Sequence, residues 1–209
     1  AEEEFQDENP DCAAYSRRFA SLTLTRDEAL LFIARGTCGV SIYDVAEPTN
    51  IIFKGNYQTH ITDGSPALEV VLSSDEQLAF VSVRDTRQDA GEQDLHIVDI
   101  SDPSNPQFIS ALRTSYAALH TALSSDGNTA FVVDGFYLVS FDITDPALPK
   151  LISYSPMVDN SGIQLTDEET SPYALVISAD GQRAYIASKG YGLFTVSYTH
   201  LRAHETQLH

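Results

Sequence analysis

Two histidines are the candidates in this sequence for chemistry near neutral pH. His60 and His120 each lie close to the start of a short segment that is expected to form the first β-strand of a repeated unit, and such strands line the central channel of a propeller. An imidazole there could bind a ligand or a metal, or accept a proton, because its charge changes near physiological pH. The equivalent position holds Glu69 in the second unit and Ala174 in the fourth. The alternative is a histidine bonded to backbone groups or to water.

Acidic side chains gather in the longest irregular segment of the chain. Hard cations need several oxygen ligands at once, and carboxylates supply them. The segment lacks the alternating Asp/Asn and Gly spacing of a calcium-binding loop, so a solvated acidic loop is favoured and no metal site is predicted. The carboxylates concerned are Asp159, Asp167, Glu168 and Glu169.

Nothing in the sequence has the pattern of a catalytic nucleophile or of a cofactor site. The Gly-x-Ser-x-Gly elbow is absent, and no pairing of a cysteine with a histidine is suggested by position. Serines such as Ser73 and Ser124 fall in expected hairpin turns, and their repetition indicates a structural role. The Gly-Tyr-Gly at 190–192 joins two expected strands instead of opening a helix, so it does not predict a phosphate-binding loop. No catalytic residue and no cofactor are predicted.

The two cysteines, Cys12 and Cys38, leave two possibilities open. In an exported protein a Cys12–Cys38 disulfide would tie the N-terminal segment to the first repeated unit. In a reducing compartment both would be free thiols. Two cysteines are too few for a four-ligand zinc site, and no histidine lies near either of them in sequence.

Short turns that contain aspartate repeat four times along the chain and predict its architecture. Asp27, Asp75, Asp126 and Asp180 are separated by 48, 51 and 54 residues, and a run of small and aromatic residues follows each. A period near 50 that is filled with short apolar strands is typical of β-propeller blades. In the third unit an Asp-Gly hairpin and a proline-containing turn separate four expected strands.

The predicted fold class is therefore all-β, a propeller of four-stranded antiparallel blades present as a fragment of about three and a half blades. Residues 1–18 are expected to form an acidic, flexible tail, and the fourth unit lacks its outer strand. The aspartates that end the third strands, Asp44, Asp99 and Asp142, are expected to bond turn amides. The blades are expected over residues 19–60, 66–113, 118–156 and 172–195.

Up-and-down connectivity sorts the connections onto two faces of such a fold. Turns after first and third strands are short and share one face, whereas the long segments 55–66, 83–94 and 157–172 share the other. Variable loops usually carry function, so we expect the second face to bind a ligand, although long loops also mark places that merely tolerate insertions. The candidate residues are Tyr57, His60, Asp63, Arg84, Asp85, His120, Asp159, Asp167, Glu168 and Glu169.

One stretch closely resembles a known family. The segment 96–106, His-Ile-Val-Asp-Ile-Ser-Asp-Pro-Ser-Asn-Pro, is similar to the LVIVD repeat, in which a hydrophobic run and Val-Asp-Ile precede Ser-Asp-Pro. The resemblance extends over roughly residues 19–195. It implies a β-propeller of the kind found on exported or surface-anchored bacterial proteins, and it brings no catalytic residues. Ala46-Glu47-Pro48 and Ser140 depart from the pattern. The Asp-Gly repeats are also similar to those of Tyr-Val-Thr-Asn propellers and lactonase-like enzymes, but the Asp-Pro turns favour the LVIVD repeat.

The C-terminal segment 196–209 interrupts the repeat. Its residues from Val196 to Thr206 look like one translated frame of the transposon-end adapter used in sequencing libraries. Such segments are excluded from reasoning about the fold. The authentic part of this sequence is therefore expected to end near Thr195, and the intact protein is expected to continue with further blades. His200 and His204 are accordingly given no role. A fragment that exposes two blade faces is expected to aggregate or dimerise.

The charge of the chain limits its partners. With 30 acidic and 12 basic residues, the formal net charge is −18, which argues against direct binding of nucleic acid or of an anionic membrane. No apolar run approaches the roughly 18–20 residues that span a bilayer. We expect an exported module (periplasmic, extracellular or at the cell surface) that binds an unknown protein or glycan without catalysis, alongside the remaining blades of a longer chain. The alternative is a propeller enzyme, a hydrolase or an oxidoreductase, with its site in the central channel.

Overall fold

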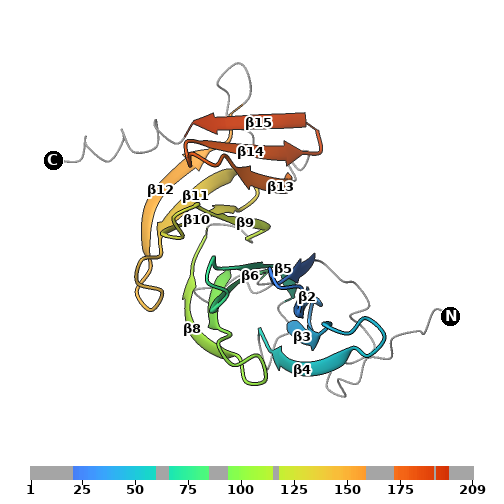
Figure 1. Ribbon diagram of the computed structural model, residues 1–209. Helices are drawn as coiled ribbons and strands as arrows, with labels where there is room; N and C mark the ends of the chain where they lie inside the picture. The colour runs from blue at the N-terminus through green and yellow to red at the C-terminus, as the bar shows by residue number, and fades with distance from the viewer. Residues whose placement is uncertain are drawn as a thin grey trace.

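Four antiparallel sheets make up the part of the chain that the computed structural model describes, residues 21–59, 66–84, 94–114, 118–158, 172–190 and 192–197. In each sheet the strand order follows the sequence (Figure 1). The first sheet holds β1 (Ser21–Leu24), β2 (Leu30–Ala34), β3 (Val40–Asp44) and β4 (Ile52–Tyr57). The second holds β5 (Ala67–Leu72), β6 (Leu78–Val83), β7 (Leu95–Asp99) and β8 (Gln107–Leu112). The third holds β9 (His120–Leu123), β10 (Thr129–Val133), β11 (Tyr137–Asp142) and β12 (Lys150–Pro156), and the fourth β13 (Pro172–Ile177), β14 (Arg183–Ser188) and β15 (Gly192–Ser197). The prediction of four-stranded antiparallel blades is confirmed.

The last described strand extends beyond the expected end of the repeat at Thr195. β15 includes Val196 and Ser197, which pair with Ala184 and Arg183 of β14. The rest of the C-terminal segment lies outside the described residues, as does the expected tail 1–18. Among the described residues, the fourth sheet has three strands.

The first strand of every sheet lies on the inside of an arc, and the fourth strands β4, β8 and β12 lie on its rim (Figure 1). The inner strands contact one another in order, β1 with β5, β5 with β9 and β9 with β13. Hydrogen bonds join them: Thr23 Oγ1 donates to the Val70 carbonyl (2.5 Å), and the Val70 amide donates to Ser21 Oγ (3.1 Å). This radial arrangement is that of propeller blades.

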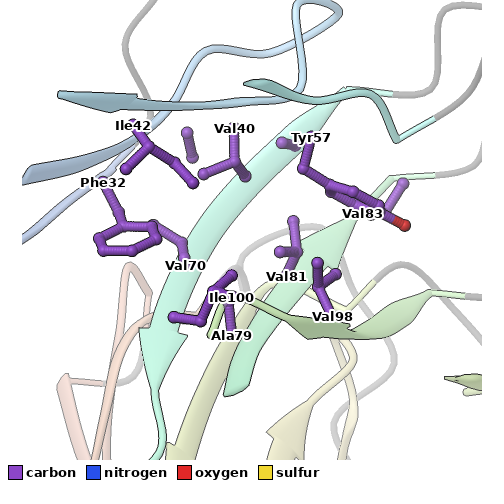
Figure 2. Packing of buried hydrophobic residues seen from close by; sticks show 12 residues of the cluster. Phe32, Val40, Ile42, Tyr57, Val70, Ala79, Val81, Val83, Val98 and Ile100 are labelled. Atoms are coloured by element: carbon purple, nitrogen blue, oxygen red, sulfur yellow. The ribbon is translucent and has the colours of Figure 1, made fainter. Parts of the chain in front are cut away.

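Neighbouring sheets share hydrophobic cores, because successive side chains of a strand point to opposite faces of its sheet. In the first core Phe32 and Ile42 of the first sheet pack against Val70 of the second (Figure 2). Phe80 and Phe131, at the same repeated position as Phe32, pack toward the third and fourth sheets in their turn. The small-plus-aromatic runs of the sequence thus build three successive cores between sheets.

The hairpin turn after each first strand is closed by the same side-chain bonds in all four sheets. In the third sheet Ser124 Oγ donates to Asp126 Oδ1 (2.5 Å) and accepts a bond from the Thr129 amide (2.9 Å). The Asn128 amide also donates to Asp126 Oδ1 (3.0 Å). The same three bonds recur in the turns at 25–30, 73–78 and 178–183. The structural role predicted for the turn serines is confirmed.

The aspartates that end the third strands also bond their turns, as predicted. Asp44, Asp99 and Asp142 each accept the amide of the residue two positions later, at 3.2, 2.9 and 3.0 Å. We call this side of the molecule the turn face; it consists of residues 25–29, 45–51, 73–77, 100–106, 124–128, 143–149 and 178–182. The opposite side, where second and fourth strands end, is the loop face. The described residues hold no helix with the length and apolarity of a membrane span.

Candidate ligand-binding site at the loop face

His120 is the first residue of β9 and lies at the loop face of the third sheet. In each of the other three sheets, the strand register places one residue of the first strand at the position that His120 occupies in the third. This register confirms the prediction that Glu69 and Ala174 are equivalent to His120. The four residues and their partners on the second strands are Ser21 with Ala34, Glu69 with Ser82, His120 with Val133 and Ala174 with Ala187.

Glu69 and His120 form a contact between the second and third sheets. Glu69 Oε1 lies 3.2 Å from His120 Nδ1, and Glu69 Oε2 accepts a bond of 2.6 Å from the Thr121 amide. The two side chains keep 22% and 25% of their surface exposed. A carboxylate only accepts hydrogen bonds, so Nδ1 carries the proton and Nε2 is left for another partner. Within the described part of the chain, Glu69 is the hydrogen-bond partner found for the His120 ring.

In the first sheet a serine at the position equivalent to Glu69 makes the hydrogen bond that the structure requires there. Ser21 Oγ accepts the amide of Val70, which is the counterpart of Thr121 on the next inner strand. A hydroxyl is therefore enough to satisfy the unpaired backbone edge of the neighbouring strand. Glu69 does the same with one oxygen and adds a second oxygen and an imidazole contact. This surplus of polar groups makes the pair a candidate for ligand contact.

Tyr57 lies inside a core and not on the surface of the loop face. It is 8% exposed between the first and second sheets, and its hydroxyl lies 2.8 Å from His96 Nδ1. The two rings meet edge-on, and the His96 ring meets Phe108 in the same way. Burial raises the pKa of the Tyr57 phenol. Since burying an aromatic ring in an apolar core is favourable, we expect Tyr57 to stay in the core and not to contact a ligand.

Two arginines lie near the loop face in different surroundings. Arg84 follows β6 and is exposed, and its amide donates to the Pro66 carbonyl (3.0 Å), so its guanidinium stays a candidate. Arg35 follows β2 and is buried, and its Nη1 donates to Ser41 Oγ (3.0 Å). Ser41 in turn donates to Asn56 Oδ1 (2.9 Å). Arg35 belongs to a structural network that the sequence did not reveal.

Most of the remaining candidates lie outside the described residues, and their roles stay predictions: His60, Asp63, Asp85, Asp159, Asp167, Glu168 and Glu169. Cys38 is disulfide-bonded. Cys12, the other cysteine of the chain, lies outside the described residues, so the Cys12–Cys38 pairing stays a prediction.

The described residues contain no group of three His, Cys, Asp or Glu side chains placed to hold a metal ion. They do contain one buried hydroxyl without a hydrogen-bond partner, that of Ser188. Ser188 ends β14 at the loop face, opposite Pro172 of β13. A buried hydroxyl left unpaired costs roughly 1–3 kcal/mol, so this end of the fourth sheet carries an unsatisfied polar atom.

The carboxylates of the turn face are engaged by their own turns. Hydrogen bonds from the Ser124 hydroxyl and the Asn128 amide lower the pKa of Asp126 below its usual value of 3.8. Side-chain and backbone hydrogen bonds lower the pKa in the same way at Asp27, Asp75, Asp99, Asp102, Asp142 and Asp180. A ligand would have to compete with these internal bonds.

Glu69 and Tyr173 are the loop-face residues that sequence reasoning did not single out. For Glu69 the signal was present, since a carboxylate stands where the other repeats have serine, histidine and alanine. Tyr173 is 59% exposed near the beginning of β13, where the register shifts between Pro172 and Ala174. That shift could not be read from the sequence, because it depends on how β13 pairs with β14.

The comparisons with known proteins agree with this architecture. The family model of the LVIVD repeat matches residues 28–59, 90–114 and 122–154, within the first three sheets. No curated protein matches the chain.

Solved β-propeller structures resemble the chain at low identity, which shows a shared fold alone. The periplasmic gluconolactonase PpgL of Pseudomonas aeruginosa has 17% identity and a TM-score of 0.63, over 86% of this chain and 49% of that one. A protein from Lactobacillus plantarum has 17% identity and a TM-score of 0.65, over 86% and 53%. The propeller domain of Myceliophteria thermophila Cps50 (Swd1) has 13% identity and a TM-score of 0.58, over 86% and 52%.

The chain thus spans about half the length of the solved structures that it matches. The repeated sheets and the three matched stretches agree on one classification. This protein is a β-propeller whose first three sheets carry LVIVD repeats.

Proposed function

We propose that the chain is a non-catalytic, extracytoplasmic binding module that holds a protein or glycan ligand on its loop face. The proposal rests on a difference between the polar side chains of the two faces. The aspartates and serines of the turn face bond their own backbone, whereas the loop face presents a Glu69–His120 pair beyond structural need. The exposed Arg84 on the same face adds a charged donor.

Two observations support a location outside the cytoplasm. Cys38 is disulfide-bonded, and disulfides persist mainly in oxidising compartments. One of the similar structures is described as periplasmic. The acidic composition, with a formal net charge of −18, agrees with a well-hydrated exported protein.

The test introduces a glutamate on each face in turn. Arg84→Glu changes the loop face, and Leu148→Glu changes the turn face at an exposed leucine. Purified protein is screened against a displayed peptide library and a glycan array, and binding of the best probe is then titrated for both variants. We expect Arg84→Glu to weaken binding at least about tenfold and Leu148→Glu to leave it unchanged. Equal loss in both variants, or loss in Leu148→Glu alone, would contradict the proposal.

The Glu69–His120 pair also favours a second candidate, a propeller enzyme (a hydrolase or an oxidoreductase) with its site in the central channel. A carboxylate that orients an imidazole is a common way to hold a general base. In that case the wild-type protein turns over a substrate, and His120→Ala abolishes turnover without changing the melting temperature. A binding module instead shows affinity without turnover.

A further inference from the structure

Three successive inner strands bring a carboxylate, an imidazole and a phenol to the loop face. Glu69 lies near the beginning of β5, His120 begins β9, and Tyr173 is the second residue of β13. β5 contacts β9, and β9 contacts β13. These strands follow one another around the inside of the arc (Figure 1), so the three residues stand near the loop-face ends of successive inner strands.

The carboxylate and the imidazole have a defined arrangement. Glu69 Oε1 engages His120 Nδ1 (3.2 Å), and Glu69 Oε2 is held by the Thr121 amide (2.6 Å). With Nδ1 as the donor to Glu69, Nε2 faces away from the carboxylate and is left for a ligand, and the carboxylate keeps free lone pairs of its own. Both side chains stay about one quarter exposed, which leaves them within reach of a ligand. The pair is therefore suited to hydroxyl groups, which donate and accept.

Tyr173 supplies an aromatic surface on the neighbouring strand. It is 59% exposed, although burying an aromatic ring is usually favourable. Leu68 occupies the corresponding register shift of β5 and remains only partly buried with a sheet on either side. The exposed Tyr173 ring is therefore available as a platform near the loop-face end of β13.

We propose that Glu69, His120 and Tyr173 form a binding site for a neutral oligosaccharide. This inference rests on the proposed binding function and names its ligand class. A sugar ring packs its apolar CH face on an aromatic ring, and its hydroxyls hydrogen-bond to the imidazole and the carboxylate. The Glu69 carboxylate and the formal net charge of −18 disfavour an anionic ligand.

The test is calorimetric titration with cellohexaose, maltohexaose and chitohexaose as probes. We expect at least one hexaose to bind, with Tyr173→Ala and His120→Ala each weakening its affinity at least about tenfold. Leu148→Ala, on the turn face, is the control and is expected to bind as the wild type does. Thermal unfolding curves check that the variants fold. If His120→Ala does not fold, the affinity of Tyr173→Ala for the hexaose tests the site, because Tyr173 is exposed.

Besides contacting the ligand, Glu69 positions the His120 ring. Glu69→Gln keeps an oxygen for the Thr121 amide but loses the charge that holds the Nδ1 proton. Nitrogen NMR of the His120 ring is expected to show the proton on Nδ1 in the wild type and a mixture of tautomers in Glu69→Gln. Addition of the hexaose is expected to shift the Nε2 resonance. A tautomer that Glu69→Gln leaves unchanged would overturn the positioning role of Glu69.

The remaining outcomes separate this inference from the proposed function. Hexaose binding that survives both Tyr173→Ala and His120→Ala overturns the site. Binding of peptides but of no hexaose, with sensitivity to Arg84→Glu, overturns the sugar assignment and leaves the binding module standing. Absence of any ligand in both screens overturns both proposals.

Discussion

At the scale of single residues, two glutamates hold a backbone conformation that usually belongs to glycine. Glu28 and Glu76 have φ of 58°, in the turns where the third and fourth sheets have Gly127 and Gly181 at 73° and 67°. A residue with a Cβ pays about 1–2 kcal/mol for left-handed backbone. Glu76 has a compensating contact, since its Oε1 accepts the Arg26 amide (2.7 Å) and joins the first two sheets.

Glu28→Gly is therefore expected to stabilise the protein. Relief of the left-handed strain exceeds the extra chain entropy of glycine, and the net gain is roughly 0.5–1 kcal/mol. Urea unfolding of wild type and variant measures the difference. Glu76→Gly is the matched comparison and is expected to gain less, because it removes the bond to the Arg26 amide. A larger gain in Glu76→Gly than in Glu28→Gly would contradict this account.

Asp126 makes the stability of its turn depend on pH. Its pKa in the folded protein is lowered below 3.8 by hydrogen bonds from Ser124 and Asn128. Because the folded pKa is the lower one, the stabilisation is present above the unfolded value near 3.8 and is lost as pH falls through the folded value.

We expect Asp126→Asn to be less stable than the wild type at pH 6 and to approach it as the pH falls from 3.8 through the lowered pKa of Asp126. The comparison is made by urea unfolding of both proteins at each pH, so that effects of the high overall charge cancel. A difference that stays constant from pH 6 to pH 3, or grows on acidification, would show that the charge of Asp126 does not contribute.

At the scale of the elements, the outer strand of one sheet receives a turn of the next. A Cβ placed on Gly55 of β4 would lie 2.4 Å from the Pro103 carbonyl of the β7–β8 turn. Ser110, which occupies the same position on β8, donates from Oγ to the Pro146 carbonyl of the β11–β12 turn (2.6 Å). The first two sheets therefore approach more closely at this point than the next two.

Gly55→Ala is expected to destabilise the protein by roughly 1–3 kcal/mol, because the added methyl group must push the β7–β8 turn away from β4. Ser110→Ala removes one hydrogen bond without adding volume and is expected to cost only about 1 kcal/mol. Thermal or urea unfolding compares the two. If Gly55→Ala proves no worse than Ser110→Ala, the close approach of Pro103 is not a constraint.

At the scale of the whole molecule, the fourth sheet exposes a face that its counterparts bury. Val176 and Leu193 are 60% and 67% exposed. Their counterparts in the second sheet, Val71 and Leu95, pack in the core shared with the third sheet. Covering an apolar side chain of this size contributes about 1.5–3 kcal/mol, so this face favours association.

We therefore expect the isolated chain to dimerise or aggregate as its concentration rises. Leu193→Asp is expected to shift the molecular mass toward the monomer, whereas Leu148→Asp on the turn face is not. Light scattering after size-exclusion chromatography measures the mass of each protein. A sharp monomer peak for the wild type, together with a cooperative melt, would contradict the expectation.

Much of this fold could be predicted from the sequence because its determinants are local. The hairpin at Asp126, for example, needs only its own serine, aspartate and glycine, and the strands around it follow from alternating apolar residues. Candidate site residues were harder to predict. Tyr57 lies in a core against His96, 39 residues away, and Arg35 is buried in a network with Ser41. The burial of each side chain depends on the neighbouring strand or sheet and not on the residues next to it in sequence.

The order of the strands, their antiparallel pairing and the chemistry of the turn face were determined by the sequence alone, because hydrophobic period and turn residues act over a few positions. The tertiary structure decided which residues meet between sheets. Glu69 and His120 are 51 residues apart, and only the register of two adjacent inner strands brings them together. The exposure of Tyr173 likewise depends on how the fourth sheet is packed and not on its neighbours in sequence. Contacts across sheets depend on the angle and height at which whole sheets stack, which no local pattern specifies.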